Sequence, residues 1–366
     1  MDKIGKYQIL KKLGEGATSV VHLAHDPFAE RDVAIKVMAS NVFSEGERGK
    51  LARKLFVTEA SLAGKLNHPH ITQIYDAAAD ADPSYIVMEY VAGGTLEPYC
   101  TPDKLLPLVD VVEMIFKCSR ALDFAYRLGV IHRDLKPANI LRGGDSGTDV
   151  KISDLGAAIT TSSDQTAIAG IGSPAYMSPQ QVQDWPLDHR TDIFSLGVVM
   201  YQLLTGQLPF QGSNNGSIVY QILNTQPPPP SALRAGIPPV VDAVVMKAMQ
   251  KSLEDRYASW DDFSFDLAEA FRNERLAQTR TEIADSEKFN TLRGLSFFRN
   301  FSDVQLWEVL RLSDWQRTQP GTVLMREGTP GDTFCILAGG EVKVTKNAKL
   351  LNILSAGECF GEMAYL

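Results

Sequence analysis

A chain of 366 residues exceeds what one hydrophobic core usually organises, so two domains are expected. Its hydrophobic fraction of 44% and charged fraction of 22% are ordinary for a globular protein, and a net charge of -8 argues against nucleic acid as a main partner, because phosphate binding needs clustered Lys and Arg. Four widely spaced cysteines argue against structural zinc or a disulfide framework, and no segment approaches the roughly 20 apolar residues that span a bilayer, so we expect a soluble, cytoplasmic protein.

The first part of the chain is predicted to be rich in strands and the next part mostly helical. Short apolar runs broken by glycine indicate strands and a hairpin between residues 7 and 37, and another strand at 85–90. Apolar positions recur at helical spacing over 105–128 and again over 193–204. Because proline cannot continue a helix, we expect the proline run at 227–230 to form a surface loop.

The last quarter of the chain predicts a linker and a second, smaller domain. Residues 271–288 are rich in charge and poor in large apolar side chains, which favours a solvated helix between two domains. After Leu292, glycines separate strand-like runs such as 341–345, which is typical of a small β-roll or barrel. We therefore expect domains at 7–270 and 289–366.

A glycine-rich turn and a lysine on the following strand predict a phosphate site. Residues 14–19 read Gly-Glu-Gly-Ala-Thr-Ser between two expected strands, where bare backbone N–H groups can approach phosphate oxygens. Alone this is weak, since such a turn is more often a simple hairpin and Ser19 stands where a third glycine is usual. Lys36, in Val-Ala-Ile-Lys on the next strand, could grip nucleotide phosphates; by itself it would be a solvated strand lysine.

The segment 131–139 reads Ile-His-Arg-Asp-Leu-Lys-Pro-Ala-Asn and is the most specific signal. Asp134 can accept the proton of an attacking hydroxyl, Lys136 can offset charge on a transferred phosphoryl group, and Asn139 can bind Mg²⁺ through its amide oxygen. Asp154 follows a strand-like run and adds a second hard oxygen ligand. An Asp-Leu-Gly turn is ordinary by itself, but at this distance behind Asn139 it predicts a metal site.

In this order the motifs resemble the protein kinase family, particularly the eukaryotic-like serine/threonine kinases of bacteria, over about residues 7–270. The resemblance implies an α+β, bilobal fold, with a β-rich small lobe, a helical large lobe and ATP in the cleft. Lys136-Pro137 resembles the serine/threonine branch, which implies transfer of the γ-phosphoryl group of Mg-ATP to Ser or Thr hydroxyls of protein substrates. By match, the nucleotide would contact Leu13, Gly14, Gly16, Val21, Ala34, Lys36, Glu89, Val91 and Leu141.

The resemblance also implies supporting residues around this site. Glu59, in the helical stretch before Leu-Asn-His-Pro, is the expected partner of Lys36, whereas Glu45 and Glu47 are disfavoured because the glycine-bearing stretch around them resembles a loop. Asp192 matches the buried aspartate that braces the catalytic loop.

Besides Ser19, two positions depart from the family pattern. Leu155 replaces a phenylalanine but keeps apolar bulk. Gln180 replaces a glutamate that pairs with an arginine, here Arg256; an amide can still accept from the guanidinium but loses the charge-assisted bidentate geometry, so we expect lower stability and intact chemistry. Between 154 and 179, several hydroxyls could take phosphate and pair with Arg133, although a flexible polar loop is the alternative for most. They are Thr160, Thr161, Ser162, Ser163, Thr166 and Ser173.

The segment 289–366 resembles a cyclic-nucleotide-binding domain, on its glycine-bearing runs at 321–324, 327–332 and 340–342 and on Phe-Gly-Glu-Met-Ala-Tyr-Leu at 360–366. The resemblance implies that Glu362 holds the ribose hydroxyl and that N–H groups near Ala364 hold the cyclic phosphate. The arginine that binds this phosphate in the family would lie beyond Leu366, so we expect a fragment, with cyclic AMP or cyclic GMP as ligand only of a longer chain.

Two classes of function remain open from the sequence. The leading hypothesis is catalysis modulated by the C-terminal module. The alternative is a pseudokinase scaffold that binds nucleotide and partners without turnover, which Ser19 and Gln180 would favour, although both substitutions spare the catalytic atoms. A pure cyclic-nucleotide sensor is disfavoured by the missing arginine.

Overall fold

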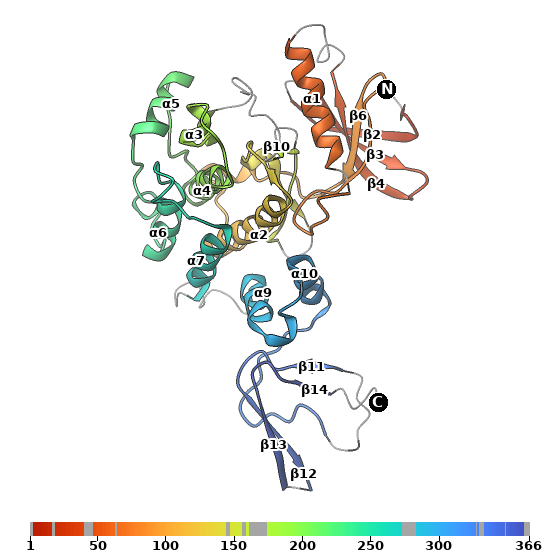
Figure 1. The fold of residues 1–366 in the computed structure, drawn as a ribbon, viewed down its shortest axis with the longest axis vertical. Helices are drawn as coiled ribbons and strands as arrows, with labels where there is room; N and C mark the ends of the chain where they lie inside the picture. Colours follow the sequence, from red (N-terminus) through yellow and green to blue (C-terminus); the bar gives the residue numbers. More distant parts are fainter. Residues whose placement is uncertain are drawn as a thin grey trace. The chain divides into compact units, whose positions relative to one another are not determined.

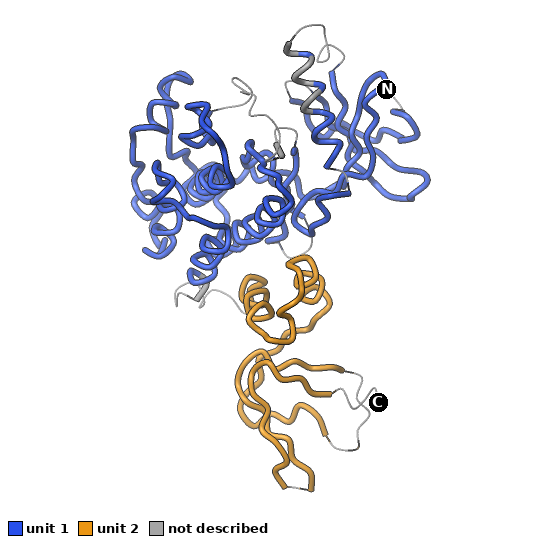
Figure 2. The backbone as a smooth tube through the Cα atoms, in the orientation of Figure 1, with its two compact units in different colours: residues 1–279 blue, residues 280–366 orange. Residues whose placement is uncertain are grey.

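The computed structural model describes residues 3–16, 19–39, 47–62, 64–143, 147–155, 159–160, 174–272, 283–326, 328, 333–347 and 349–361. The chain divides into two compact units, Met1–Thr279 and Arg280–Leu366 (Figure 2). The division falls inside the segment 271–288 that the sequence predicts as a linker. Most of the predicted linker helix, at 273–282, lies outside the described residues.

Unit 1 opens with an antiparallel sheet in the strand order β1-β2-β3-β4-β6-β5. Its strands are β1 (Lys3–Ile4), β2 (Tyr7–Glu15), β3 (Ser19–Asp26), β4 (Arg31–Met38), β5 (Ile74–Ala78) and β6 (Tyr85–Glu89). Helix α1 (Glu47–Ser61) lies beside this sheet (Figure 1). The strands predicted between 7 and 37 and at 85–90 are thereby confirmed.

The side chains of β4 alternate between the two faces of the sheet, and this alternation shows on which face Lys36 lies. Its odd-numbered positions from 33 to 37 belong to a buried cluster on one face of the sheet. Ala34 belongs to a second cluster that includes Phe56 of α1. Because side chains alternate across a strand, Lys36 shares the face of Ala34, which is the face that α1 covers.

Most of the rest of unit 1 is helical. The helices are α2 (Leu108–Arg127), α3 (Pro179–Val182), α4 (Arg190–Thr205), α5 (Asn215–Asn224), α6 (Pro239–Ala248) and α7 (Trp260–Arg272), with 3-10 turns η1 (Glu97–Tyr99), η2 (Pro137–Asn139), η4 (Pro174–Tyr176) and η5 (Pro230–Ala232). Between α2 and α3, β7 (Val130–Ile131) pairs with β10 (Ile159–Thr160), and β8 (Ile140–Gly143) pairs with β9 (Asp149–Ile152). The two helices predicted from periodicity match α2 and α4.

Helix α4 is the buried centre of this helical lobe. Every residue of it except Arg190 and Gln202 is buried, as expected for a helix that is apolar on all sides. Gly197 permits close packing, because a Cβ there would lie 2.8 Å from the Cβ of Ala248 at the end of α6. The helix stops at Gly206, whose φ of 74° provides a left-handed cap.

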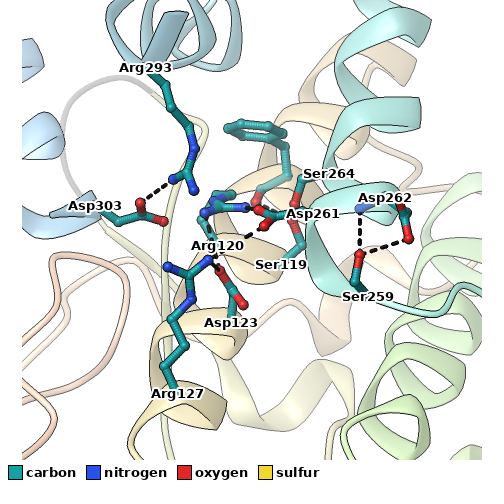
Figure 3. A network of polar contacts seen from close by, with 11 residues as sticks. Ser119, Arg120, Asp123, Arg127, Ser259, Asp261, Asp262, Ser264, Arg293 and Asp303 are labelled. Atoms are coloured by element: carbon teal, nitrogen blue, oxygen red, sulfur yellow. Dashed lines mark hydrogen bonds and ion pairs between the residues drawn. The ribbon is translucent and has the colours of Figure 1, made fainter. Parts of the chain in front are cut away.

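Polar contacts hold α7 against α2. Arg120 of α2 donates to Asp261 of α7 at 2.6 Å and to Asp123 at 3.2 Å (Figure 3). The hydroxyls of Ser119 and Ser264 lie 2.8 Å apart across the same helix pair. Because these groups satisfy one another, α2 can bury charged and polar side chains in the centre of the lobe.

Unit 2 begins with α9 (Asp285–Gly294), η6 (Ser296–Phe298) and α10 (Asp303–Leu312). Its strands are β11 (Cys335–Ile336), β12 (Glu341–Lys346), β13 (Lys349–Ser355) and β14 (Cys359–Phe360), paired as β11 with β14 and β12 with β13. Phe289 and Trp307 join the two helices, with ring centroids 4.8 Å apart. The strand predicted at 341–345 is present as β12.

No helix in the described parts of either unit combines the length and the apolar character that crossing a membrane requires.

Candidate active site

A lysine held between two carboxylates forms one side of the site. Lys36 Nζ of β4 donates to Glu59 Oε2 of α1 at 2.9 Å and to Asp154 Oδ1 at 2.6 Å. The Lys36 and Glu59 side chains are 13% and 5% exposed, whereas Asp154 is 42% exposed. The structure thus brings together a strand, a helix and the segment after β9, and it leaves the Asp154 carboxylate open on one side.

The ionisation of these groups follows from burial and from their mutual charge. Burial would lower the pKa of Lys36, but the charges of Glu59 and Asp154 outweigh it and the pKa is raised. Burial raises the pKa of Glu59, although the charge of Lys36 opposes this rise. Burial would also raise the pKa of Asp154, but there the charge of Lys36 outweighs it and the pKa is lowered. Lys36 therefore remains a cation at neutral pH.

One sequence expectation beside this cluster was wrong. The stretch around Glu47 was expected to form a loop, but α1 begins at Glu47 and continues through Gly49. A single glycine costs a helix only about 1 kcal/mol, which the packing of Phe56 against the sheet offsets. Glu45 lies outside the described residues.

A buried aspartate holds the loop after β7 in place. Asp192 of α4 accepts from the backbone N–H of His132 at 2.7 Å and of Arg133 at 2.9 Å. Arg133 has a φ of 69°, a left-handed conformation that a non-glycine residue keeps only when its surroundings fix it. Burial raises the pKa of Asp192, opposed by His132 and by these two N–H groups. The structure therefore places Asp192 under the loop, where the family resemblance put it.

The same loop gathers a carboxylate, an ammonium and an amide. Lys136 Nζ donates to Asp134 Oδ2 at 2.8 Å. Asn139 Nδ2 donates to the Asp134 carbonyl at 2.8 Å and to its Oδ2 at 3.1 Å. These bonds fix the Asp134 carboxylate at the surface of the loop, where it can accept a further proton donor.

Two oxygens in the site suit a hard cation. Because its nitrogen faces Asp134, the Asn139 amide turns its oxygen away, and no donor in the described ranges reaches that oxygen. Asp154, at a φ of 61°, offers a partly exposed carboxylate. The described ranges contain no cluster of three or more His, Cys, Asp or Glu suited to a metal. Two protein oxygens completed by phosphates and waters are what Mg²⁺ prefers, so the residues fit this ion.

The expected nucleotide-contacting residues lie on the six-stranded sheet, on the segment that leaves it and on β8. Val21 lies opposite Lys36 and Ala34 lies opposite Met88 in the strand register. A Cβ on Gly14 would meet nothing within 4 Å, so the hairpin is open at that point. The remaining members are Leu13, which is exposed, Gly16, whose N–H donates to the Ser19 carbonyl, Glu89 at the end of β6, Val91 just after it, and Leu141 on β8.

Comparison with known proteins places this geometry in a family. Residues 7–259 match the model of the protein kinase domain. The chain belongs to the protein kinase family. Residues 315–366 match the model of the cyclic nucleotide-binding domain. The second match falls in unit 2, whose segment containing Glu362 lies outside the described residues.

Relatives of the kinase include several bacterial serine/threonine-protein kinases. PknB of Mycobacterium leprae is 40% identical over 72% of this chain and 42% of its own length. PknB of Mycobacterium tuberculosis H37Rv is 38% identical over 78% of this chain and 46% of its own length, and PrkC of Bacillus subtilis is 34% identical over 78% and 43%. The kinase therefore spans less than half the length of each of these relatives.

Gln181 contacts the loop after β7, and the sequence did not predict this contact. Gln181 of α3 forms a capping box with Ser178, and its Nε2 also donates to the Arg133 carbonyl at 2.8 Å. The Ser-x-x-Gln pattern predicts the helix start, but not the bond to the catalytic loop. The side chain of Leu155, which replaces the phenylalanine of the family pattern, is buried.

The neighbouring Gln180 contacts Arg256 through a single oxygen. Arg256 Nη1 and Nη2 both donate to Gln180 Oε1 at 3.2 Å, and the guanidinium also donates to the carbonyls of Arg190 and Gln250. Burial lowers the pKa of Arg256 to about 10. The arginine is therefore a buried cation whose hydrogen bonds within the described residues go to neutral oxygens.

Replacing Gln180 with glutamate is expected to stabilise the kinase by about 1–2 kcal/mol, because the buried guanidinium gains a charge-assisted, bidentate partner. Chemical denaturation measures the effect, and Gln226→Glu is the control, because Gln226 is exposed and its side chain has no hydrogen bond within the described residues. Unchanged or lower stability in the Gln180 variant would mean that desolvating the new carboxylate costs as much as pairing gains.

Lys251, beside this arginine, predicts a pH dependence. Its Nζ is buried without a hydrogen-bond partner in the described part of the chain and lies 3.7 Å from the centroid of Phe210. Burial, aided by the charge of Arg256, lowers its pKa to about 7. Between that pH and its ordinary pKa the unfolded chain binds the extra proton, so the free energy of unfolding should rise with pH from about 7 to 9. In Lys251→Met this part of the slope should disappear; an identical slope in both proteins would refute the assignment.

Proposed function

We propose that the kinase transfers the γ-phosphoryl group of Mg-ATP to serine or threonine hydroxyls of proteins. The observation that carries the proposal is the ion pair that places Lys36 between Glu59 and Asp154, beside a loop that presents Asp134. The printed names of the bacterial relatives, each a serine/threonine-protein kinase, support the choice of acceptor. Because ATP is an intracellular substrate, we place the activity in the cytoplasm.

In the proposed reaction the acceptor oxygen attacks the γ-phosphorus, the bond to the β–γ bridging oxygen breaks, and ADP leaves. The hydroxyl proton passes to the Asp134 carboxylate. Lys136, held 2.8 Å from that carboxylate, offsets charge on the phosphoryl group, while Lys36 orients the phosphates. Asn139 and Asp154 would hold Mg²⁺, which supplies neutralisation of phosphate charge when bound.

Incubation with γ-labelled Mg-ATP and a general protein acceptor tests this function. Label on phosphoserine or phosphothreonine of the acceptor is the expected result. Label on tyrosine alone would refute the acceptor class. Saturable nucleotide binding without any incorporated label would instead establish the pseudokinase scaffold.

The C-terminal unit is proposed to regulate the kinase by binding a cyclic nucleotide, because residues 315–366 match that domain model. Titration calorimetry with cyclic AMP and cyclic GMP, followed by the transfer assay with the ligand that binds, tests this. Saturable heat and a changed rate support regulation; binding without a change in rate refutes it.

A further inference from the structure

The connection between α1 and β5 is bonded to β9. The N–H of Thr72 donates to the Ile152 carbonyl at 2.8 Å, and the N–H of Ile152 donates to the His70 carbonyl at 2.9 Å. Ile71 and Ile152 form a parallel bridge at this point. The segment that follows α1 is therefore attached to the strand that leads to Asp154.

A side-chain ion pair joins the end of β6 to the same two segments. Val150 and Ile152 are buried, so strand alternation turns Lys151 to the other face of β9. Lys151 Nζ donates to the Pro69 carbonyl at 2.7 Å and lies 3.1 Å from Glu89 Oε1. Three segments that are distant in sequence thus share one ammonium.

Glu89 closes the arrangement with its second oxygen. Its Oε2 accepts from the N–H of Gln73 at 3.3 Å, and its own N–H donates to the Gln73 carbonyl at 2.8 Å. The Lys151 and Glu89 side chains are 24% and 26% exposed. Because both side chains are partly withdrawn from water, their attraction is screened somewhat less than in a fully exposed pair.

We propose that Lys151 is a positioning residue of the nucleotide site. Its pair with Glu89 holds β9 and the α1–β5 connection in one register against the end of β6. β9 leads to Asp154 and α1 carries Glu59, so this register decides whether both carboxylates reach Lys36. The inference rests on the proposed function only in taking this site to bind Mg-ATP, and nucleotide binding can be measured without phosphoryl transfer.

Lys151→Met is expected to raise the dissociation constant of a fluorescent Mg-ATP analogue about three- to tenfold. The KM for ATP should rise by a similar factor while kcat changes less, because Mg-ATP, once bound, would itself hold Lys36 through its phosphates and Asp154 through its metal ion. Hydrogen exchange should accelerate at residues 70–73 and 150–154. An unchanged dissociation constant would overturn the proposal, as would a loss of thermal stability alone.

Two further variants separate positioning from general damage. Lys151→Arg keeps a donor for Pro69 and Glu89 and should restore affinity. Lys65→Met makes the same change at an exposed lysine of the same connection, for which the described residues give no ion pair, and should bind as wild type.

A double-mutant cycle with Glu89→Gln completes the test. Lys151→Met and Glu89→Gln together should weaken binding no more than the stronger single change, because both remove one interaction. Additive losses would overturn the proposal. If the wild type binds nucleotide without transferring phosphate, the proposed function fails while this cycle still decides the role of Lys151.

Discussion

Asp134→Asn is expected to lower the rate of phosphoryl transfer about 10²- to 10⁴-fold, the usual contribution of a general base. The amide keeps the shape of the carboxylate and one oxygen for Lys136 and Asn139, so the loop should stay folded. What it loses is the ability to take the hydroxyl proton. Mg-ATP should therefore bind with nearly unchanged affinity while kcat falls.

Labelled transfer and fluorescent nucleotide binding, performed on the same preparations, separate these two quantities. Asp255→Asn is the matched control, since Asp255 is exposed and the described ranges show it in no ion pair. Equal incorporation in Asp134→Asn and wild type, or none in either, would contradict the assignment of Asp134 as base.

Lys36→Met should have the second-largest effect, because it removes the ammonium that pairs with both Glu59 and Asp154. Transfer should fall about 10²- to 10³-fold through lost stabilisation of phosphate charge. Stability should also fall, by up to about 3–5 kcal/mol where Glu59 stays ionised, since a buried carboxylate is left unpaired. Burial raises the pKa of Glu59, so protonation relieves the cost in acid.

The stability loss of Lys36→Met should therefore be greater at about pH 8 than at about pH 5. The substitution removes the charge that most opposes the rise in the pKa of Glu59 that burial causes. A carboxyl whose pKa is raised on folding contributes stability below its unfolded pKa, and this contribution is lost as the pH rises through its folded pKa. Urea unfolding at both pH values measures the difference, with Lys11→Met, an exposed lysine of the same sheet, as control. A pH-independent loss would mean that Glu59 is not the group left unpaired.

The parts of this fold that the sequence predicts best are those with strong local periodicity. Helices α2 and α4 follow from repeated apolar spacing, and β12 follows from a short alternating run between glycines. The start of α1 was missed because a glycine and several charges at its beginning outweigh a weak apolar pattern, whereas the packing of Phe56 against the sheet, farther along the helix, stabilises the helix as a whole.

The sequence by itself determined the family motifs and predicted the chemistry, because Asp134, Lys136 and Asn139 lie within one short loop and their spacing indicates the proposed roles. Only the tertiary structure decided which distant groups meet. Gln180 contacts Arg256, which lies 76 residues later in the sequence. Lys151 contacts Glu89 and Pro69, which lie on two other segments. The local sequence around a charged residue on a strand does not predict its partner. The partner depends on the strand register and on which segments of the chain pack against that face of the strand.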